Sequence, residues 1–170
     1  MPVVTPTILK DGQAMDSAYE LVSIDIRKEV NRVPQAELRL IDGSSAQRKF
    51  TISDDGFFDP GARIEIQLRY EGEPDTTVFK GVVVRHGVEA GPSGSILFVI
   101  IKDAVVKLTG SRQSALFADM SDSDIIKQLI ADAGLSAGEI ADTQPKHQKM
   151  VKYYATSWDF ILSRAEAQGL

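Results

Sequence analysis

The sequence contains no cysteine, so it has no disulfide bonds and no thiolate metal sites. Only 7% of its residues are aromatic, which does not favour a surface that stacks carbohydrates or bases. No apolar run approaches the roughly 18 residues of a membrane-spanning helix. The opening segment, MPVVTPTILKDG, lacks the basic start and long apolar stretch of a signal peptide. From these absences we expect synthesis in the cytoplasm.

Basic residues are fewer than acidic ones, 19 against 24, and the formal net charge is −5. This balance argues against a nucleic-acid partner and against binding to an anionic membrane surface. The 170 residues are 43% apolar and 25% charged, an ordinary globular composition. A chain of this length forms one large or two small domains with a sizeable core.

The first two thirds of the sequence predict β-strands, because apolar and polar residues alternate along several short runs. Two of these runs flank the turn at Pro34 and are expected to pair as antiparallel neighbours. The run ILFVII, residues 96–101, is apolar on both faces and predicts a central strand. Five or more short strands joined by turns favour a small barrel or a sandwich. The side chains predicted to face inward are Val22, Ile24, Ile26, Ala36, Leu38, Leu40, Ile64, Ile66, Leu68 and Tyr70.

The pattern changes near Leu108, and two helices are expected beyond it. The first begins at the cap Ser121 and ends at Gly134. Its predicted buried stripe is Ile125, Ile126, Leu129, Ile130 and Ala133. A short strand is expected within KMVKYYAT, residues 149–156. The chain is therefore predicted to be α+β and mainly β, with residues 1–108 forming the β domain and residues 109–170 an α-rich segment.

The second helix is expected between the cap Thr156 and Gly169, with Asp159 returning a capping-box hydrogen bond to Thr156. Four apolar residues fall on one face at helical spacing. They are Trp158, Ile161, Leu162 and Ala165. We expect this face to be buried mainly through Trp158, Ile161 and Leu162.

Residues that could carry chemistry are few and scattered. The two histidines, His86 and His147, lack the local spacing of metal ligands, so we predict no metal site. The acidic stretch with Asp54, Asp55 and Asp59 lacks the alternation of a calcium loop and is expected to form a turn. No serine lies in a nucleophile elbow, and GPSG lacks the lysine of a phosphate loop. We therefore predict no catalytic, cofactor-binding or metal-binding residues, and a scaffold or interaction role.

The larger aromatic side chains are expected to serve the core or an interface rather than to stack on a ligand. They are Phe57, Phe58, Tyr153, Tyr154 and Trp158.

The order of these segments resembles the N-terminal part of the VgrG spike of type VI secretion and the related hubs of contractile phage-tail baseplates. FFDPGARIEIQLRYEG is similar to a family strand that follows a loop, and TTVFKGVVVRH to a strand with the spacing of Phe79, Gly81 and Val83. ADMSDSDIIKQLIADAGL is similar to a family helix that begins after a serine. The closing segment matches a family pattern at Tyr154, Ser157, Phe160, Ile161, Arg164, Glu166 and Gly169.

The resemblance implies a small antiparallel β-barrel in residues 1–108, one of two barrels that alternate around a threefold axis in a hub. It implies a homotrimer in a longer protein, whose further domains include the membrane-piercing needle. The implied partners are the tail-tube protein, other baseplate proteins and the needle of the same chain. A mechanical role of this kind uses no cofactor and no catalysis. The implied location is cytoplasmic assembly, followed by secretion or injection with the particle.

The resemblance does not distinguish a secretion spike from a phage hub or a related injection particle. Two alternatives of other classes stay open. One is a baseplate-associated hydrolase, which a cleft with two carboxylates of different pKa would support. The other is a stand-alone module that binds glycans or peptides, which exposed aromatics in a groove or an open sheet edge would support.

Overall fold

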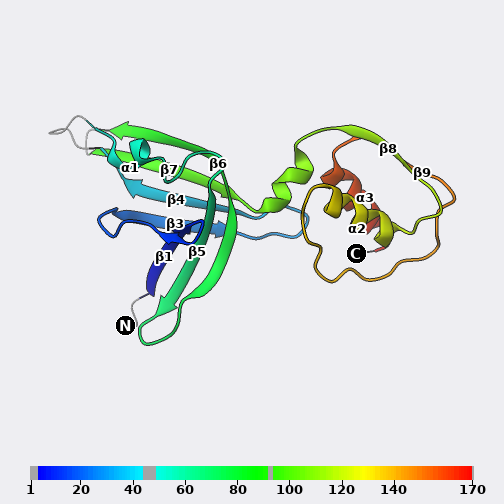
Figure 1. Ribbon diagram of the computed structural model, residues 1–170, viewed down its shortest axis with the longest axis horizontal. Helices are drawn as coiled ribbons and strands as arrows, with labels where there is room; N and C mark the ends of the chain where they lie inside the picture. Colours follow the sequence, from blue (N-terminus) through cyan, green and yellow to red (C-terminus); the bar gives the residue numbers. More distant parts are fainter. Residues whose placement is uncertain (1–3, 44–48, 92–93, 170) are drawn as a thin grey trace. The chain divides into compact units, whose positions relative to one another are not determined.

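A computed structural model describes residues 4–43, 49–91 and 94–169 (Figure 1). The chain forms two compact units, Met1–Ala104 (unit 1) and Val105–Leu170 (unit 2). Its class is α+β and mainly β, as predicted. None of the helices in the described ranges has the length and apolar character that a membrane crossing requires.

Unit 1 contains one antiparallel sheet of seven strands in the order β2-β1-β5-β6-β7-β4-β3. The edge strands β2 and β3 do not pair with each other in the described residues, so the predicted barrel is an open sheet. The two-residue β2 is too short to supply a closing ladder. The elements are β1 (Val4–Lys10), β2 (Gln13–Ala14), β3 (Leu21–Arg27), β4 (Gln35–Ile41), α1 (Thr51–Asp55), β5 (Arg63–Tyr70), β6 (Thr76–Gly91) and β7 (Gly94–Lys102).

Strand β6 belongs to both halves of this sheet. Its first part, up to Val82, pairs with β5, and the part from Val82 onward pairs with β7. A register shift between Val83 and Arg85 interrupts the second ladder, and β6 is curved in Figure 1. Next to this irregularity, a Cβ on Gly81 would lie 2.4 Å from the carbonyl oxygen of Lys102 on β7. Only glycine allows the two backbones to come this close.

The core of unit 1 lies on one face of the sheet and confirms most of the predicted inward positions. Ala36, Leu38 and Leu40 on β4 are fully buried, and β3 and β4 are antiparallel neighbours as predicted. Strand β7 is central, between β6 and β4. Its core-facing residues are fully buried and those of its second face half-buried. The fully buried set is Leu97, Val99 and Ile101.

Two inward predictions are wrong. Val22 is exposed, because a register shift between Leu21 and Ser23 turns Leu21 toward the core in its place. Tyr70 is 59% exposed although it shares a face with the buried Ile66. Alternation sets which face a side chain occupies, but not whether anything covers that face.

The predicted turn around Asp54 and Asp55 contains the short helix α1. The buried carboxylate of Asp42 lies at the start of this helix and accepts hydrogen bonds from the backbone N–H groups of Ile52 (3.0 Å) and Ser53 (2.9 Å). Because Asp42 is ten residues away from Ile52, local spacing did not reveal the cap. Phe57 and Phe58 follow the helix and are core residues, as expected.

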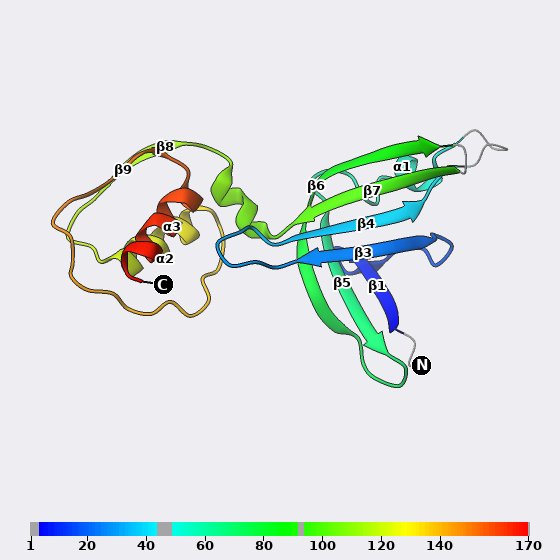
Figure 2. The same cartoon turned by 180° about the vertical axis from the view of Figure 1, so that it is seen from behind.

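Unit 2 combines a two-stranded antiparallel ribbon with two helices that lie side by side (Figure 2). Its core cluster is Phe117, Ile125, Leu129 and Phe160. The elements, which follow the 3-10 helix Ala104–Thr109, are β8 (Gln113–Phe117), α2 (Asp122–Asp132), β9 (Met150–Ala155) and α3 (Ser157–Ala167).

The predicted helix ends are confirmed. Ser121 caps α2 and forms a capping box with Asp124, and Gly134 follows the helix with φ of +66°. Thr156 caps α3 by accepting a hydrogen bond from the Asp159 N–H at 3.0 Å. The predicted return bond from the Asp159 side chain to Thr156 is not found among the described residues. Along the predicted stripe of α2, Ile125 and Leu129 are buried and the other members are half-buried.

The predicted burial of α3 through Trp158 is wrong. Phe160 is the buried residue of α3, and its ring stacks on Phe117 with the ring centres 6.1 Å apart. Trp158 is half-buried and lies outside the core cluster, whereas Ile161 packs against the core cluster. The buried face of α3 also carries the polar side chains of Arg164 and Gln168, which donate hydrogen bonds to Asp122 of α2. The prediction considered apolar residues only, and it therefore chose the neighbouring face of the helix.

The close approach at Gly81 leads to a stability prediction. Gly81→Ala should lower the free energy of unfolding by about 1–3 kcal/mol, because the new methyl group must displace the β7 backbone. Gly91→Ala on the same strand is the matched control. There the nearest atom to a Cβ is 3.7 Å away, and the change should stay below about 1 kcal/mol. Urea unfolding followed by circular dichroism measures both, and equal midpoints would contradict the role of Gly81.

Candidate functional site

A fully buried carboxylate, Asp122, joins three segments of unit 2. It is the first residue of α2 and its side chain has no exposed surface. Arg164 of α3 donates from Nε to Oδ1 at 2.7 Å and from Nη2 to Oδ2 at 3.0 Å. Gln168 donates to Oδ2 at 2.6 Å, and His147 Nε2 lies 3.2 Å from Oδ1. We call these four residues the Asp122 cluster.

The hydrogen bonds from Arg164 are the main reason that the pKa of Asp122 falls from its usual 3.8 to about 2. Burial acts in the opposite direction, and the bonds from Gln168 and His147 add to the lowering. The same pairing raises the pKa of Arg164. Both oxygens of Asp122 are engaged by protein donors, and the group stays ionised at neutral pH. The cluster is therefore suited to fastening α2 to α3 and not to transferring protons.

The first turn of α2 is also occupied by the protein's own groups. Ser121 accepts from the Asp124 N–H, and the Ser123 N–H donates to Thr143 Oγ1 at 2.8 Å. The Thr143 N–H returns a hydrogen bond to Ser123 Oγ at 3.2 Å. These contacts fix the polar loop that follows α2 onto the start of the helix.

The sequence did not predict the Asp122 cluster. Among its members, His147 was predicted not to bind a metal and Arg164 was named only within the family resemblance. The available signal was the spacing of Phe160, Arg164 and Gln168, which repeats every four residues and puts all three on one face of α3.

The two histidines lie in different units. His147 belongs to the Asp122 cluster, while His86 lies on β6 in unit 1. His86 is half-buried, and its Nδ1 has no hydrogen-bond partner among the described residues. Within residues 4–43, 49–91 and 94–169, no three histidine, aspartate or glutamate side chains are grouped to hold a metal ion. The predicted absence of catalytic, metal and cofactor residues stays a prediction.

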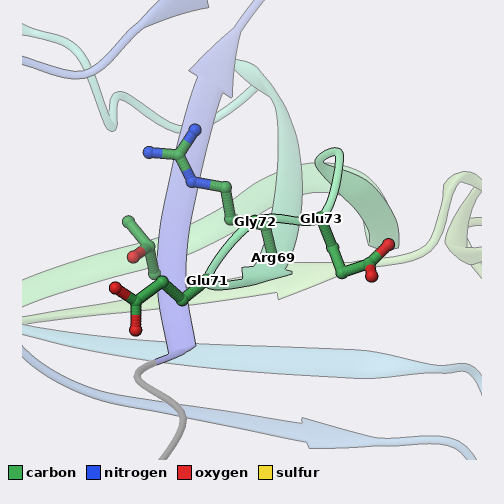
Figure 3. Close-up of a pocket in the computed structure, with 5 residues that line it drawn as sticks. Arg69, Glu71, Gly72 and Glu73 are labelled. Carbon is green, nitrogen blue, oxygen red and sulfur yellow. The ribbon is translucent and has the colours of Figure 1, made fainter.

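An open recess lies on one side of the loop between β5 and β6. It has a volume of about 600 Å³ and is lined by Thr5, Arg69, Glu71, Gly72 and Glu73. The side chains of Glu71 and Glu73 extend in different directions (Figure 3). This recess therefore does not gather the two carboxylates that the hydrolase alternative needs.

An apolar surface is exposed on unit 2, on the outer side of the β8–β9 ribbon. Leu116 and Val151 are direct cross-strand partners, and Tyr153 follows Val151 on the same face. All three are exposed, Tyr153 to 83%. Their neighbours Phe117 and Lys152 point to the other face and are buried. We call Leu116, Val151 and Tyr153 the ribbon face. Contiguous exposed apolar residues of this kind mark sites of protein contact.

The Asp122 cluster leads to a pH-dependent prediction. The pKa of Asp122 is lower in the folded state, so its contribution is complete above the unfolded value of 3.8 and is lost as the pH falls toward about 2. At pH 7 this contribution is about 2 kcal/mol. Asp122→Asn should lower the free energy of unfolding by about that amount at pH 7, with a smaller loss at pH 2. Asp132→Asn, at the exposed end of α2, is the control; a loss for Asp122→Asn that does not change between pH 2 and 7 would contradict the linkage.

The fold is shared with solved tail and secretion proteins. The 43 kDa tail protein of prophage MuSo2 from Shewanella oneidensis matches with a TM-score of 0.68 at 14% identity, over 98% of this chain and 51% of that protein. A type VI secretion component from E. coli, described as structurally similar to phage T4 tail proteins, matches with a TM-score of 0.64 at 11% identity. That match covers 91% of this chain and 41% of the E. coli protein.

A chain of the Francisella PdpA–VgrG complex matches with a TM-score of 0.57 at 12% identity, over 96% of this chain and 25% of that chain. This chain thus spans about half or less of the length of the structures it matches. At these identities the likeness concerns the fold. It supports the predicted resemblance to phage-tail and type VI secretion proteins in its broad form.

No curated protein matches the sequence significantly. One family model does, and it is not the VgrG model that the resemblance would suggest. It is described as the Alg8 N-terminal domain and matches residues 1–170. By this full-length match, the chain belongs to the Alg8 N-terminal domain family.

Proposed function

We propose that this chain is a structural part of a contractile injection machine, within the hub that joins the tail tube to the membrane-piercing needle. The observation that carries the proposal is the fold likeness, which extends over more than nine tenths of the chain for a phage tail protein and for a type VI secretion component. The match includes both units, so the likeness is not limited to a common sheet.

In the proposed role the protein acts through contacts and not through catalysis. The ribbon face supports this, because three exposed apolar side chains on a two-stranded ribbon are suited to burial against a neighbouring protein. The Asp122 cluster fastens α2 to α3 through hydrogen bonds from Arg164 and Gln168. A mechanical part gains from such a link between its helices.

The proposed assembly is a homotrimer of the full-length protein, with the tail-tube protein, other baseplate proteins and the needle as partners. The shared fold with a chain of the PdpA–VgrG complex is consistent with a spike-related assembly. The proposed location is the cytoplasm during assembly and the exported particle afterwards.

The direct test is made in the organism that encodes the protein. Deletion of the gene should abolish complete contractile particles in electron micrographs of cell lysates, and the wild-type gene supplied in trans should restore them. Threefold density for this chain between tube and needle in the averaged particle is the expected position. Normal particles in the deletion strain would overturn the proposal.

The ribbon face gives a second prediction for the same assay. Val151→Lys should reduce the number of assembled particles at least tenfold, because a buried contact would have to accept an unpaired charge. Val30→Lys is the matched control, since Val30 is an isolated, 90% exposed valine in unit 1. The purified variants should keep the wild-type melting temperature. If Val151→Lys gave wild-type numbers of particles, the ribbon face would not be a contact surface in the assembly.

A further inference from the structure

The sheet of unit 1 extends beyond the core that covers it. On β5, Ile64 and Ile66 are buried on the core-facing side, and Tyr70 continues the same row with 59% of its surface exposed. On the neighbouring β1, Ile8 is buried, and Val4, which pairs with Tyr70, is 43% exposed. The core-facing row of apolar side chains therefore runs on into solvent.

A recess of about 420 Å³ lies at this uncovered end. Its apolar lining comes from three segments, β1, β5 and the start of β6 with the loop before it. We call it the overhang recess. Its apolar residues are Val4, Leu68, Tyr70, Pro74 and Val78. Sheet surfaces of this kind are normally buried, so the recess is suited to receive an apolar side chain from outside the unit.

The loop beside the overhang recess is acidic. Glu71, Glu73 and Asp75 lie within five residues, and Arg69 is the basic neighbour, 4.0 Å from Asp75. Within residues 69–75, three negative charges and one positive charge leave a net charge of −2 (−3 + 1). Lys28 is a further basic residue nearby, with Nζ donating to the carbonyl oxygen of Val78 at 2.8 Å. The side chains of Glu71 and Glu73, labelled in Figure 3, form no ion pair with any residue in the described ranges. Glu73 also lines the recess itself.

We propose that the overhang recess binds an extended segment of another protein in which an apolar side chain stands next to lysine or arginine. The apolar side chain would occupy the space between Val4 and Tyr70. The basic side chain would lie against Glu73, which lines the recess and forms no ion pair among the described residues. Glu71 lines the other recess, with Thr5 and Arg69. Complementary charge at the rim selects the partner and speeds its approach, while the apolar contact supplies most of the affinity.

Two other occupants fit the same features less well. A second copy of this chain would bring another acidic loop to the same place, and like charges would oppose the contact. An added β-strand would have to pair along β1, whose outer side pairs, among the described residues, only with β2 at Leu9 and Lys10. Pro6, in the middle of the open stretch, has no N–H to donate. A contact through side chains is therefore favoured over backbone pairing.

The inference concerns unit 1 alone and does not depend on the proposed mechanical role, so either can fail without the other. The first experiment titrates the ¹⁵N-labelled 170-residue protein with an eight-residue peptide of alternating lysine and valine. Amide signals of Val4, Leu68 and Thr76 should shift in a saturable way. Peptides of alternating glutamate and valine, or lysine and serine, should bind at least tenfold more weakly, since each lacks one of the two features.

Variants of the protein then separate the apolar contact from the charge. Tyr70→Ser should weaken binding of the lysine–valine peptide at least tenfold, whereas Tyr153→Ser, at an exposed tyrosine of the ribbon face, should not change it. Glu73→Lys should weaken binding to a similar extent and reduce its dependence on salt. Glu139→Lys, an exposed change in unit 2, is the charge-matched control. All the changed residues are at exposed positions, and the dispersion of the amide spectrum reports whether each variant is folded.

Three results would overturn the proposal. Equal affinity for the glutamate–valine peptide would exclude charge selection, and shifts confined to other parts of the protein would exclude the recess. Dimerisation that Tyr70→Ser abolishes, measured by sedimentation without peptide, would assign the recess to a second copy of the chain.

Discussion

Strand β6 determines the form of unit 1, because both halves of the sheet are built on it. Its early residues pair with β5 and its later residues with β7, so a change in its path would separate one half from the other. The strand can serve both because Gly81 admits the Lys102 carbonyl and because the ladder shifts register just beyond it. The family resemblance includes Gly81 between Phe79 and Val83, and the structure gives the physical reason for a glycine there. Phe79 and Val83 are buried on either side of it.

Unit 2 depends on a different kind of constraint. Its apolar core is small, and the buried Asp122 cluster adds a charged, fully hydrogen-bonded link between α2 and α3. An ion pair in such a place adds little net stability relative to an apolar pair of the same shape, but loss of one partner leaves a buried charge. The cluster therefore specifies how the helices meet more than it strengthens the unit. The paired and ionised state of Asp122 also makes it a poor acid or base at neutral pH.

Each unit has an exposed apolar surface that its own fold does not cover. The ribbon face exposes apolar side chains on unit 2, and the overhang recess exposes a continuation of the core row on unit 1. Both fit the proposed role, in which the protein works by contact with other proteins. The fold shared with phage-tail and secretion proteins is the basis on which the class of machine is proposed.

The sequence by itself determined the features that depend on near neighbours along the chain. Alternation of side chains located the inward residues of β4, and the caps Ser121 and Thr156 and the glycines Gly134 and Gly169 marked the helix ends. These follow from local backbone geometry, in which period and capping groups lie within four residues of each other.

Only the tertiary structure decided the features that join distant residues. The shift at Val22, the open sheet in place of a barrel, and the exposure of Tyr70 depend on which strands pair and on what covers them. The cap that Asp42 provides to α1 and the bond between Asp122 and Arg164 join residues 10 and 42 positions apart. Phe160 became the anchor of α3 in place of Trp158 because Arg164 and Gln168 turn their face toward Asp122. A hydrophobic pattern counts apolar residues only and gives no weight to a polar side chain whose partner lies on another helix.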